Sequence, residues 1–238
     1  MKFENTEVFN FEGALRGMRN PMNSHNRSDS GYNYNCLNGC RSDCPSKVHE
    51  NSCNDDLYCN NFTIGQNDMK LAQTLIKAGN EHRKFMRQIM VSVDITAPLY
   101  WWKECDVYKV GTTANSTSTM HKLATTPITL ECFEIDDCYS ELTFGNNDII
   151  GEMFERHIAD LEMLRLKYLE TKDKRYWKEL IRLLPESWLQ TRTITMNYEN
   201  VRNMYFQRKN HKLTEWSKSF VEWVEGLPYA KELIMYEG

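Results

Sequence analysis

Apolar and polar residues alternate strictly from Val91 to Thr96, where two valines and an isoleucine are separated by serine, aspartate and threonine. A period of two predicts a β-strand with one buried face. Pro98 is expected to end this strand and to open a helix, because a proline at the first helical position loses no backbone hydrogen bond. The residues that follow, Leu99–Lys109, hold two tryptophans and two tyrosines among charged side chains, which predicts a half-buried helix.

Apolar residues recur with a helical period in later parts of the chain. The pattern predicts helices over 68–79, 148–170, 172–184 and part of 213–238. Gly79 is expected to cap the first of them at its C-terminus, and the two successive helices in the middle suit a helical layer or an oligomer surface. Helical spacing also places Val201, Met204 and Tyr205 on one side of a helix, with Arg208 one turn later.

Residues 31–67 lack a sustained apolar period and are rich in Asn, Ser, Asp, Gly and Cys, which predicts a long insertion or loop. His49 lies there among the cysteines Cys36, Cys40, Cys44, Cys53 and Cys59. Such a group can supply four ligands to Zn²⁺, and metal binding would order a polar loop. The spacings hold no Cys-x2-Cys pair, so unligated thiols and disulfides remain alternatives. We interpret the stretch as a structural insert within a single domain, 1–238.

Two further stretches have side chains suited to a ligand. Gly111–Thr119 contains no large side chain and is rich in hydroxyl and amide groups, so a ligand can approach its backbone closely. Near the N-terminus, a short strand or anchor is expected at Val8–Phe11. After it, Arg16 and Arg19 stand beside flexible glycines and could clamp a phosphate. The alternative is a surface loop with unrelated arginines.

Composition and charge narrow the class of protein. The 238-residue chain is 41% hydrophobic, a normal share for a chain that buries a core. Its 29 basic and 33 acidic side chains give a net charge of −4, so no basic excess points to nucleic acid. No apolar run approaches the roughly 20 residues that span a bilayer, and the first residues lack the apolar core of a signal peptide. We therefore expect a cytoplasmic protein that binds neither nucleic acid nor membrane.

The order of strand, proline, aromatic helix and hydroxyl-rich loop resembles the signature region of the flavin-dependent thymidylate synthases. Positions that match the family's Ala-Pro, Arg-Gln, Asn and Ser are Ala97-Pro98, Lys103-Glu104, Asn115 and Ser118. A second matching stretch holds Leu184-Pro185, Thr193, Thr195, Asn197 and Arg208. The family's Arg-His-Arg triplet reads Val107-Tyr108-Lys109 here, and its closing Arg-Tyr reads Met120-His121. At most one cation of the triplet is therefore kept.

The resemblance implies an α/β fold, with a central sheet flanked by helices, that assembles as a homotetramer. It also implies methylation of dUMP to dTMP with methylenetetrahydrofolate and reduced flavin. The positions that it assigns to FAD are His82, Lys103, Lys109 and Asn115. Those that it assigns to the nucleotide substrate are Arg16, Thr113, Ser118 and Arg208, with Arg208 and Ser118 expected to act in catalysis.

Two other functions remain open. Loss of two cations from the triplet also suits a catalytically inactive protein that sequesters or senses a nucleotide. A structural module with a zinc-binding insert is the third alternative. For single residues, His82 could lie on an exposed turn, and Arg208 could pair with Glu199 at the end of its helix. Arg83, Lys84 and Arg87 are expected to form a solvated face.

Overall fold

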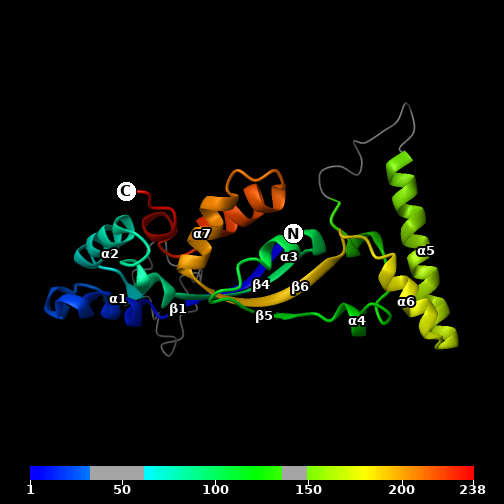
Figure 1. Cartoon of the computed structure of the whole chain (residues 1–238), viewed down its shortest axis with the longest axis horizontal. Helices are drawn as coiled ribbons and strands as arrows, with labels where there is room; N and C mark the ends of the chain where they lie inside the picture. Colours follow the sequence, from blue (N-terminus) through cyan, green and yellow to red (C-terminus); the bar gives the residue numbers. More distant parts are fainter. Residues whose placement is uncertain (33–61, 136–148) are drawn as a thin grey trace, which may run out of the picture.

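The computed structural model describes residues 1–32, 62–135 and 149–238. Figure 1 shows an elongated molecule with a β-sheet through its middle. Helices α1, α2 and α7 and the C-terminal segment gather toward one end, and α5 and α6 form the other. Within the described ranges, no helix has both the length and the apolar composition needed to cross a membrane.

The main sheet has four strands in the order β1-β4-β6-β5, and each neighbouring pair is antiparallel. The strands are β1 (Lys2–Phe9), β4 (Met90–Pro98), β5 (Thr113–Ser116) and β6 (Leu189–Asn197). The expected combination of a sheet with helices is confirmed in this form. The predicted strand at Val91 is β4, which lies inside the sheet, and Pro98 is its last residue.

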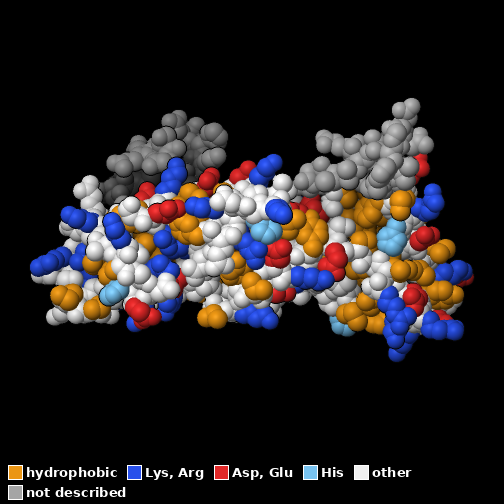
Figure 2. Space-filling view, turned by 45° about the horizontal axis from the view of Figure 1, so that its top comes forward, with side chains coloured by type: hydrophobic (Ala, Val, Ile, Leu, Met, Phe, Trp, Pro, Cys, Tyr) orange, Lys and Arg blue, Asp and Glu red, His pale blue; other side chains and the backbone are white. Residues whose placement is uncertain are grey.

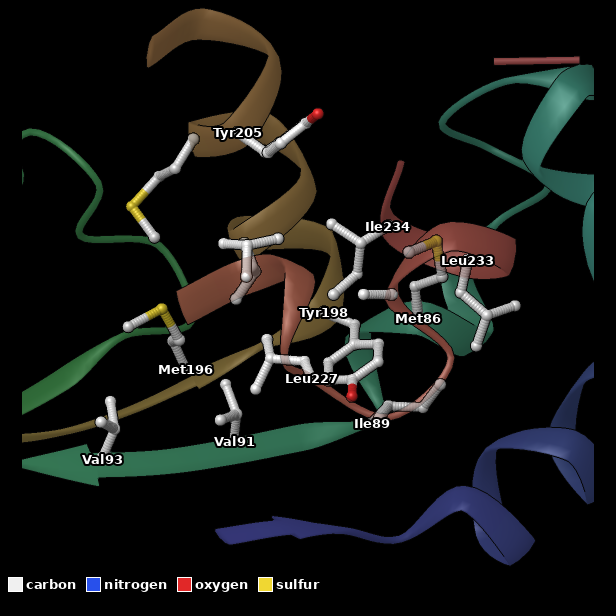
Figure 3. Packing of buried hydrophobic residues seen from close by; sticks show 14 of the residues in the cluster. Met86, Ile89, Val91, Val93, Met196, Tyr198, Tyr205, Leu227, Leu233 and Ile234 are labelled. Carbon is white, nitrogen blue, oxygen red and sulfur yellow. The ribbon is translucent and has the colours of Figure 1, made fainter. Parts of the chain in front are cut away.

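The alternation along β4 divides the sheet into two faces. Its apolar residues, Val91, Val93, Ile95 and Ala97, are fully buried, whereas the polar residues between them are partly exposed. Helices α3 (Leu99–Cys105) and α7 (Tyr198–Arg208) contribute to the core on the apolar face. Figure 3 shows Val91 and Val93 on the same side of β4, with Val91 beside Leu227.

The predicted helices appear with small shifts in their ends. They are α2 (Gln66–Ala78), α5 (Ile149–Thr171) and α6 (Lys174–Arg182). Gly79 follows α2 with φ +107°, and its N–H donates to Ile76 O, so the expected C-cap is confirmed. The remaining short elements are α4 (Thr119–Lys122), α8 (Val221–Glu225), the 3₁₀ turns Asn20–Met22, His25–Arg27, Lys84–Arg87 and Leu130–Cys132, and the π-helical segments Glu215–Phe220 and Ala230–Ile234.

Four local expectations differ from the structure. The aromatic helix ends at Cys105, four residues before Lys109, and the loop expected from Gly111 contains strand β5, because its backbone pairs with β6. The last helix is divided into the short segments given above. Near the N-terminus, the strand is β1, but the expected arginine loop is helix α1 (Phe11–Arg19). Its apolar residues recur at helical spacing and are buried, which outweighs the two glycines.

The ends of the predicted insert belong to regular structure. Strand β2 (Gly31–Tyr32) pairs antiparallel with β3 (Phe62–Thr63), and α2 begins at Gln66. Asp68 in α2 accepts hydrogen bonds from the side chains of Ser28 and Ser30 and pairs with Arg19 at 2.5 Å. The base of the insert is therefore tied to α1 and α2. The five cysteines proposed as zinc ligands lie outside the described residues.

The described part of the chain has two hydrophobic clusters. The larger one joins the sheet to α1, α2, α3, α7 and the C-terminal segment. The smaller one lies at the α5–α6 end and consists of Leu123, Ile128, Phe133, Ile158, Leu161 and Leu180. Because the second cluster is small, much of α5 remains in contact with solvent.

Candidate functional site

Arg208 lies at the C-terminal end of α7 and is held by residues of two other elements. Its Nη1 donates to Glu104 Oε2 at 2.8 Å, and its Nε donates to Tyr108 Oη at 3.0 Å. The guanidinium also lies 5.1 Å from the ring centre of Trp216. Among the described residues, its third nitrogen, Nη2, has no hydrogen-bond acceptor. Arg208 is therefore fixed in position, and the two N–H groups of Nη2 can donate to a ligand.

Glu199, the partner of Arg208 that the sequence suggested, does not pair with it in the structure. Glu104 takes this role, and His211 Nε2 lies 3.4 Å from the same carboxylate oxygen. Glu199 is buried and instead binds Arg83 Nε at 3.1 Å and the Nε of Arg87. The expected solvated face is confirmed in part: Lys84 and Arg87 are exposed, whereas Arg83 is mostly buried. Through Glu199, both arginines also tie the turn after α2 to the start of α7.

The segment after α3 runs alongside α7. Asn200 donates from Nδ2 to Val110 O at 2.7 Å and to Thr112 Oγ1 at 2.9 Å. Gly111 has φ +72°, and a Cβ at this position would approach Asn197 Nδ2 to 2.7 Å. Asn197 caps α7 by accepting from Asn200 N. These contacts leave room only for glycine at position 111, and they set the path of the chain from Lys109 into β5.

Replacing Gly111 by alanine is expected to lower the free energy of unfolding by about 1–2 kcal/mol, because alanine is strained at this φ, with a further cost from displacing Asn197. Asn197→Ala and the double variant Gly111→Ala/Asn197→Ala complete the comparison, since a Cβ at position 111 would approach Asn197 Nδ2. Urea unfolding of the three variants measures the coupling. Losses that simply add would contradict the proposed contact with Asn197.

The polar face of the sheet is covered by hydroxyl, amide and carboxylate side chains. Thr113 and Asn115 of β5 stand opposite Thr195 and Thr193 of β6, so their side chains share one face. Thr193 Oγ1 donates to Asp94 Oδ1 at 2.6 Å. We call this the hydroxyl face; its residues are Ser92, Asp94, Thr96, Thr113, Asn115, Thr191, Thr193 and Thr195.

Asp94 carries the negative charge of the hydroxyl face. Hydrogen bonds from Thr193 and from Asn5 lower the pKa of its carboxyl group below the ordinary value, against a small opposing effect of burial. The carboxylate is therefore ionised at neutral pH. Glu4 and Glu7 of the neighbouring strand β1 pair with Asp94 and Ser92, so a ligand on this face meets neutral donors and acceptors beside several carboxylates.

The predicted site residues divide into two groups. Thr113 and Asn115 are exposed on the hydroxyl face, and Lys109 follows Tyr108, the partner of Arg208. Lys109 is exposed and forms no ion pair with any described residue. Ser118 lies just beyond β5 and caps α4, accepting from His121 N at 3.3 Å.

The other predicted residues lie elsewhere or are already paired. Lys103 Nζ binds Glu186 Oε1 at 2.6 Å on the surface. Arg16 lies exposed on α1 with its Nη1 3.9 Å from Glu12, and His82 lies on an exposed turn after α2. Arg19 is buried against Asp68, so the two arginines of α1 do not form the expected phosphate clamp.

In the described ranges, neither a reactive cysteine nor a metal site is supported. Burial raises the pKa of the Cys105 thiol to about 12, so this cysteine is not a thiolate at neutral pH. No group of three or more His, Cys, Asp and Glu in the described ranges could hold a metal ion.

A pocket of about 640 Å³ lies beside α5, but none of the predicted site residues lines it. Its lining residues are Met153, Phe154, Arg156, His157, Asp160, Leu183 and Pro185.

Sequence reasoning missed the residues that hold Arg208 in place. Glu104 was recognised only as a position in a motif, and Tyr108 only as a substitution in the triplet. Trp216 carried no signal for this role, because its contact with Arg208 depends on how the chain folds back after α7. Asn200 carried none because its bond to Val110 spans 90 positions of the chain. The one available signal was Asn197, whose type and place before a helix predict a cap.

No protein-family model matches this sequence, and no curated protein sequence is significantly similar to it. The fold resembles a crystal structure of the flavin-dependent thymidylate synthase ThyX from Helicobacter pylori complexed with FAD and dUMP, with a TM-score of 0.62 and 16% identity over 100% of this chain and 98% of that one. A second structure of that protein with FAD and dUMP gives a TM-score of 0.60 and 16% identity over 96% and 94%. Likeness at this identity shows the fold alone: the chain has a fold like that of flavin-dependent thymidylate synthases.

Proposed function

We propose that this chain binds a nucleotide beside Arg208, that the hydroxyl face on the other side of the sheet takes part in such a site in a homo-oligomer, and that its activity resembles flavin-dependent methylation of dUMP to dTMP. The observation that carries the proposal is the meeting of two stretches distant in sequence. Helix α7, which ends at Arg208, lies along the segment 108–112 that leads into β5. Both stretches match the family pattern, and the similar solved structures contain FAD and dUMP.

Each residue has a role set by its chemistry. Arg208 would donate from Nη2 to a carbonyl or phosphate oxygen of the nucleotide, and the exposed ammonium of Lys109 would pair with a phosphate. Thr113, Asn115 and Ser118 would supply neutral hydrogen bonds to the substrate or cofactor. In this proposal, Arg208 and Ser118 are also the residues closest to the reacting base, and a homo-oligomer completes the site.

The described residues fit FAD only in part. Lys109 and Asn115 are exposed and can contact a phosphate or a ring edge, whereas Lys103 is neutralised by Glu186 and His82 lies apart from this group on its turn. A bound reduced flavin would supply the hydride, and methylenetetrahydrofolate the carbon. The part of this chain would be to bind and orient the nucleotide.

A second candidate function is nucleotide binding without catalysis. The ion pairs of Lys103 with Glu186 and of Arg208 with Glu104 favour it, because each removes a positive charge that a phosphate would otherwise meet. In the triplet, Val107 is 67% exposed and brings no charge, so Lys109 is the cation that remains there. Such a protein would sequester or sense the nucleotide.

Binding of dUMP by alanine variants tests the site. Lys109→Ala and Arg208→Ala are each expected to weaken binding at least about tenfold, since a hydrogen bond to a charged group contributes about 1.5–3 kcal/mol. Lys103→Ala is the matched control, because its ammonium is already paired, and it should keep its affinity within about twofold. Isothermal titration, with circular dichroism to confirm folding, measures the effect. Unchanged affinity in both test variants would exclude this site.

An absorbance spectrum of the purified protein distinguishes the two functions. A flavin band, with FAD among the molecules released by heat, would support the synthase, and dTMP formation would then be measured with the reduced protein. Release of a nucleotide without flavin, and no dTMP formation when FAD is added, would support the binding protein. The zinc site in the insert stays a separate prediction, which metal analysis of the same sample checks.

A further inference from the structure

The pocket beside α5 lies between that helix and the end of α6. Its apolar lining comes from both sides, with Met153 and Phe154 on α5 and Leu183 and Pro185 just after α6. Figure 2 shows hydrophobic side chains gathered over this end of the molecule, with charged side chains among them. His157 Nε2 donates to Leu183 O at 2.9 Å, and the two helices share the smaller hydrophobic cluster. The two sides of this cavity of about 640 Å³, which we call the α5–α6 pocket, are therefore fixed relative to each other.

Two opposite charges line the α5–α6 pocket together with this apolar surface. Arg156 and Asp160 stand one turn apart on α5, and both are exposed. The cation precedes the anion, which is the less favourable order for an ion pair within a helix. Within the described ranges, neither side chain forms an ion pair, either with the other or with a third residue. The pocket therefore offers a ligand one guanidinium and one carboxylate beside an apolar wall.

These charges decide which class of molecule suits the pocket. An apolar acid would pair with Arg156 but bring its carboxylate close to that of Asp160, and an apolar amine would meet the opposite conflict. A molecule with both a carboxylate and an ammonium group satisfies both residues. Side chains one turn apart have Cβ atoms about 5–6 Å from each other, so the two charges of the ligand must also lie close together. This requirement excludes a long peptide and leaves a free amino acid or a dipeptide.

We propose that the α5–α6 pocket binds a small zwitterion with an apolar body, of the chemistry shared by large apolar amino acids and apolar dipeptides. The carboxylate of the ligand pairs with Arg156 and its ammonium group with Asp160. Its apolar part packs on Met153, Phe154 and Leu183. Cavities of about 300–1,000 Å³ with an apolar lining and a few polar groups are typical of small-molecule sites. None of the residues of the nucleotide site lines this pocket, so the inference does not depend on the proposed function.

Probes that lack one charge test the two contacts. Phenylalanine carries both charges, 3-phenylpropionate lacks the ammonium group, and 2-phenylethylamine lacks the carboxylate. Phenylalanine has few atoms and should bind with a dissociation constant of about 1 mM. Each truncated probe should bind about fivefold more weakly, because it loses one ion pair at an open surface. Ligand-observed NMR titration measures each constant, and leucine against leucyl-leucine shows whether the amino acid or the dipeptide is the better ligand.

Variants that remove one charge assign each contact. Arg156→Gln should weaken the binding of phenylalanine about fivefold but not that of 2-phenylethylamine, which has no carboxylate to lose. Asp160→Asn should likewise weaken the binding of phenylalanine but not that of 3-phenylpropionate. Glu152→Gln is the matched control, since Glu152 is exposed on α5 but does not line the pocket, and it should leave all three constants unchanged.

Filling the pocket should abolish the binding of every probe. Leu183→Trp places a larger side chain in the apolar wall, and Met153→Trp serves if that variant is misfolded by circular dichroism. Three results would each overturn the proposal. They are failure of both phenylalanine and leucyl-leucine to bind at tens of millimolar, truncated probes that bind as well as phenylalanine, and losses in the variants that do not depend on the matching charge of the probe.

Discussion

Asp68→Asn is expected to lower the free energy of unfolding by about 3–5 kcal/mol, the cost of removing one partner from a buried ion pair. Asp68 is fully buried, and its carboxylate accepts from Arg19 Nε at 2.5 Å and from Ser28 Oγ at 2.6 Å. In the variant, the buried guanidinium of Arg19 keeps its bonds to backbone carbonyls but loses its counter-charge. Urea unfolding at neutral pH measures the loss.

The effect of Asp68 on stability should depend on pH. Burial alone would raise the pKa of its carboxyl group, but hydrogen bonds from Ser28, Ser30 and Arg19, with the charge of Arg19, outweigh burial and leave the pKa below its ordinary value. A lowered pKa in the folded state stabilises the protein fully above the unfolded pKa, about 3.9. This stabilisation is lost as the pH falls below about 4 and through the folded pKa. The Asn variant should lack this dependence.

Two further variants separate charge burial from general disruption. Asp94→Asn is the matched control, since Asp94 also accepts two side-chain hydrogen bonds but lies on the open face of the sheet, and its loss should be much smaller. Arg19→Met combined with Asp68→Leu removes both charges and should recover part of the stability that Asp68→Asn loses. If Asp68→Asn lowers the free energy of unfolding no more than Asp94→Asn does, the buried Arg19–Asp68 pair does not stabilise the base of the insert.

Trp216→Ala should also destabilise the protein by about 3–5 kcal/mol, the range for deletion of a large aromatic side chain from a core. Trp216 is fully buried; its ring centre lies 4.4 Å from that of Trp101 and 5.2 Å from that of Phe220. The same ring supports the guanidinium of Arg208. We therefore expect the variant to weaken dUMP binding as well, under conditions where it is still folded.

Phenylalanine at this position separates packing from hydrogen bonding. Within the described residues, the buried indole N–H groups of Trp216 and Trp101 have no acceptor. Trp216→Phe keeps an aromatic ring beneath Arg208 and removes one unpaired donor, so its cost should be well below that of the alanine variant. Trp223→Ala is the control, because Trp223 is only half-buried and stacks on Phe3. Equal thermal stability of Trp216→Ala and Trp223→Ala would contradict this account.

The sequence predicted elements whose signal is local. β4 was predicted because its alternation reflects one buried face, and the cap at Gly79 because only glycine adopts that φ without strain. α5 and α6 were predicted within about two residues at each end, since their apolar residues follow the helical period. In each element, the residues needed for the prediction lie within one or two turns of each other.

Elements that depend on distant partners were missed. β5 has no buried side chain, and it is a strand because β6, about 80 positions away, offers its backbone. α1 was taken for a loop because Gly13 and Gly17 were given more weight than the buried apolar stripe. Arg19 then appeared as a candidate for phosphate binding, although Asp68, its partner in the fold, lies 49 positions away.

Partners that are distant in the sequence were missed in the candidate site as well. Arg208 was identified from its place in a pattern, but its ion pair with Glu104 joins residues 104 positions apart. The sequence could therefore indicate which residue to examine, but not that its charge is largely balanced. That balance is what makes nucleotide binding without catalysis a serious second function.

The short ladder of β2 with β3 has a consequence for the length of this chain. Tyr32 and Phe62 are directly paired, so the two ends of the stretch between them lie about 5 Å apart. A tight two-residue turn can span that gap as well as the 29 residues that now connect it. Relatives of this protein can thus gain or lose sequence here without disturbing the sheet, and a fluorescent domain could be inserted at the same place.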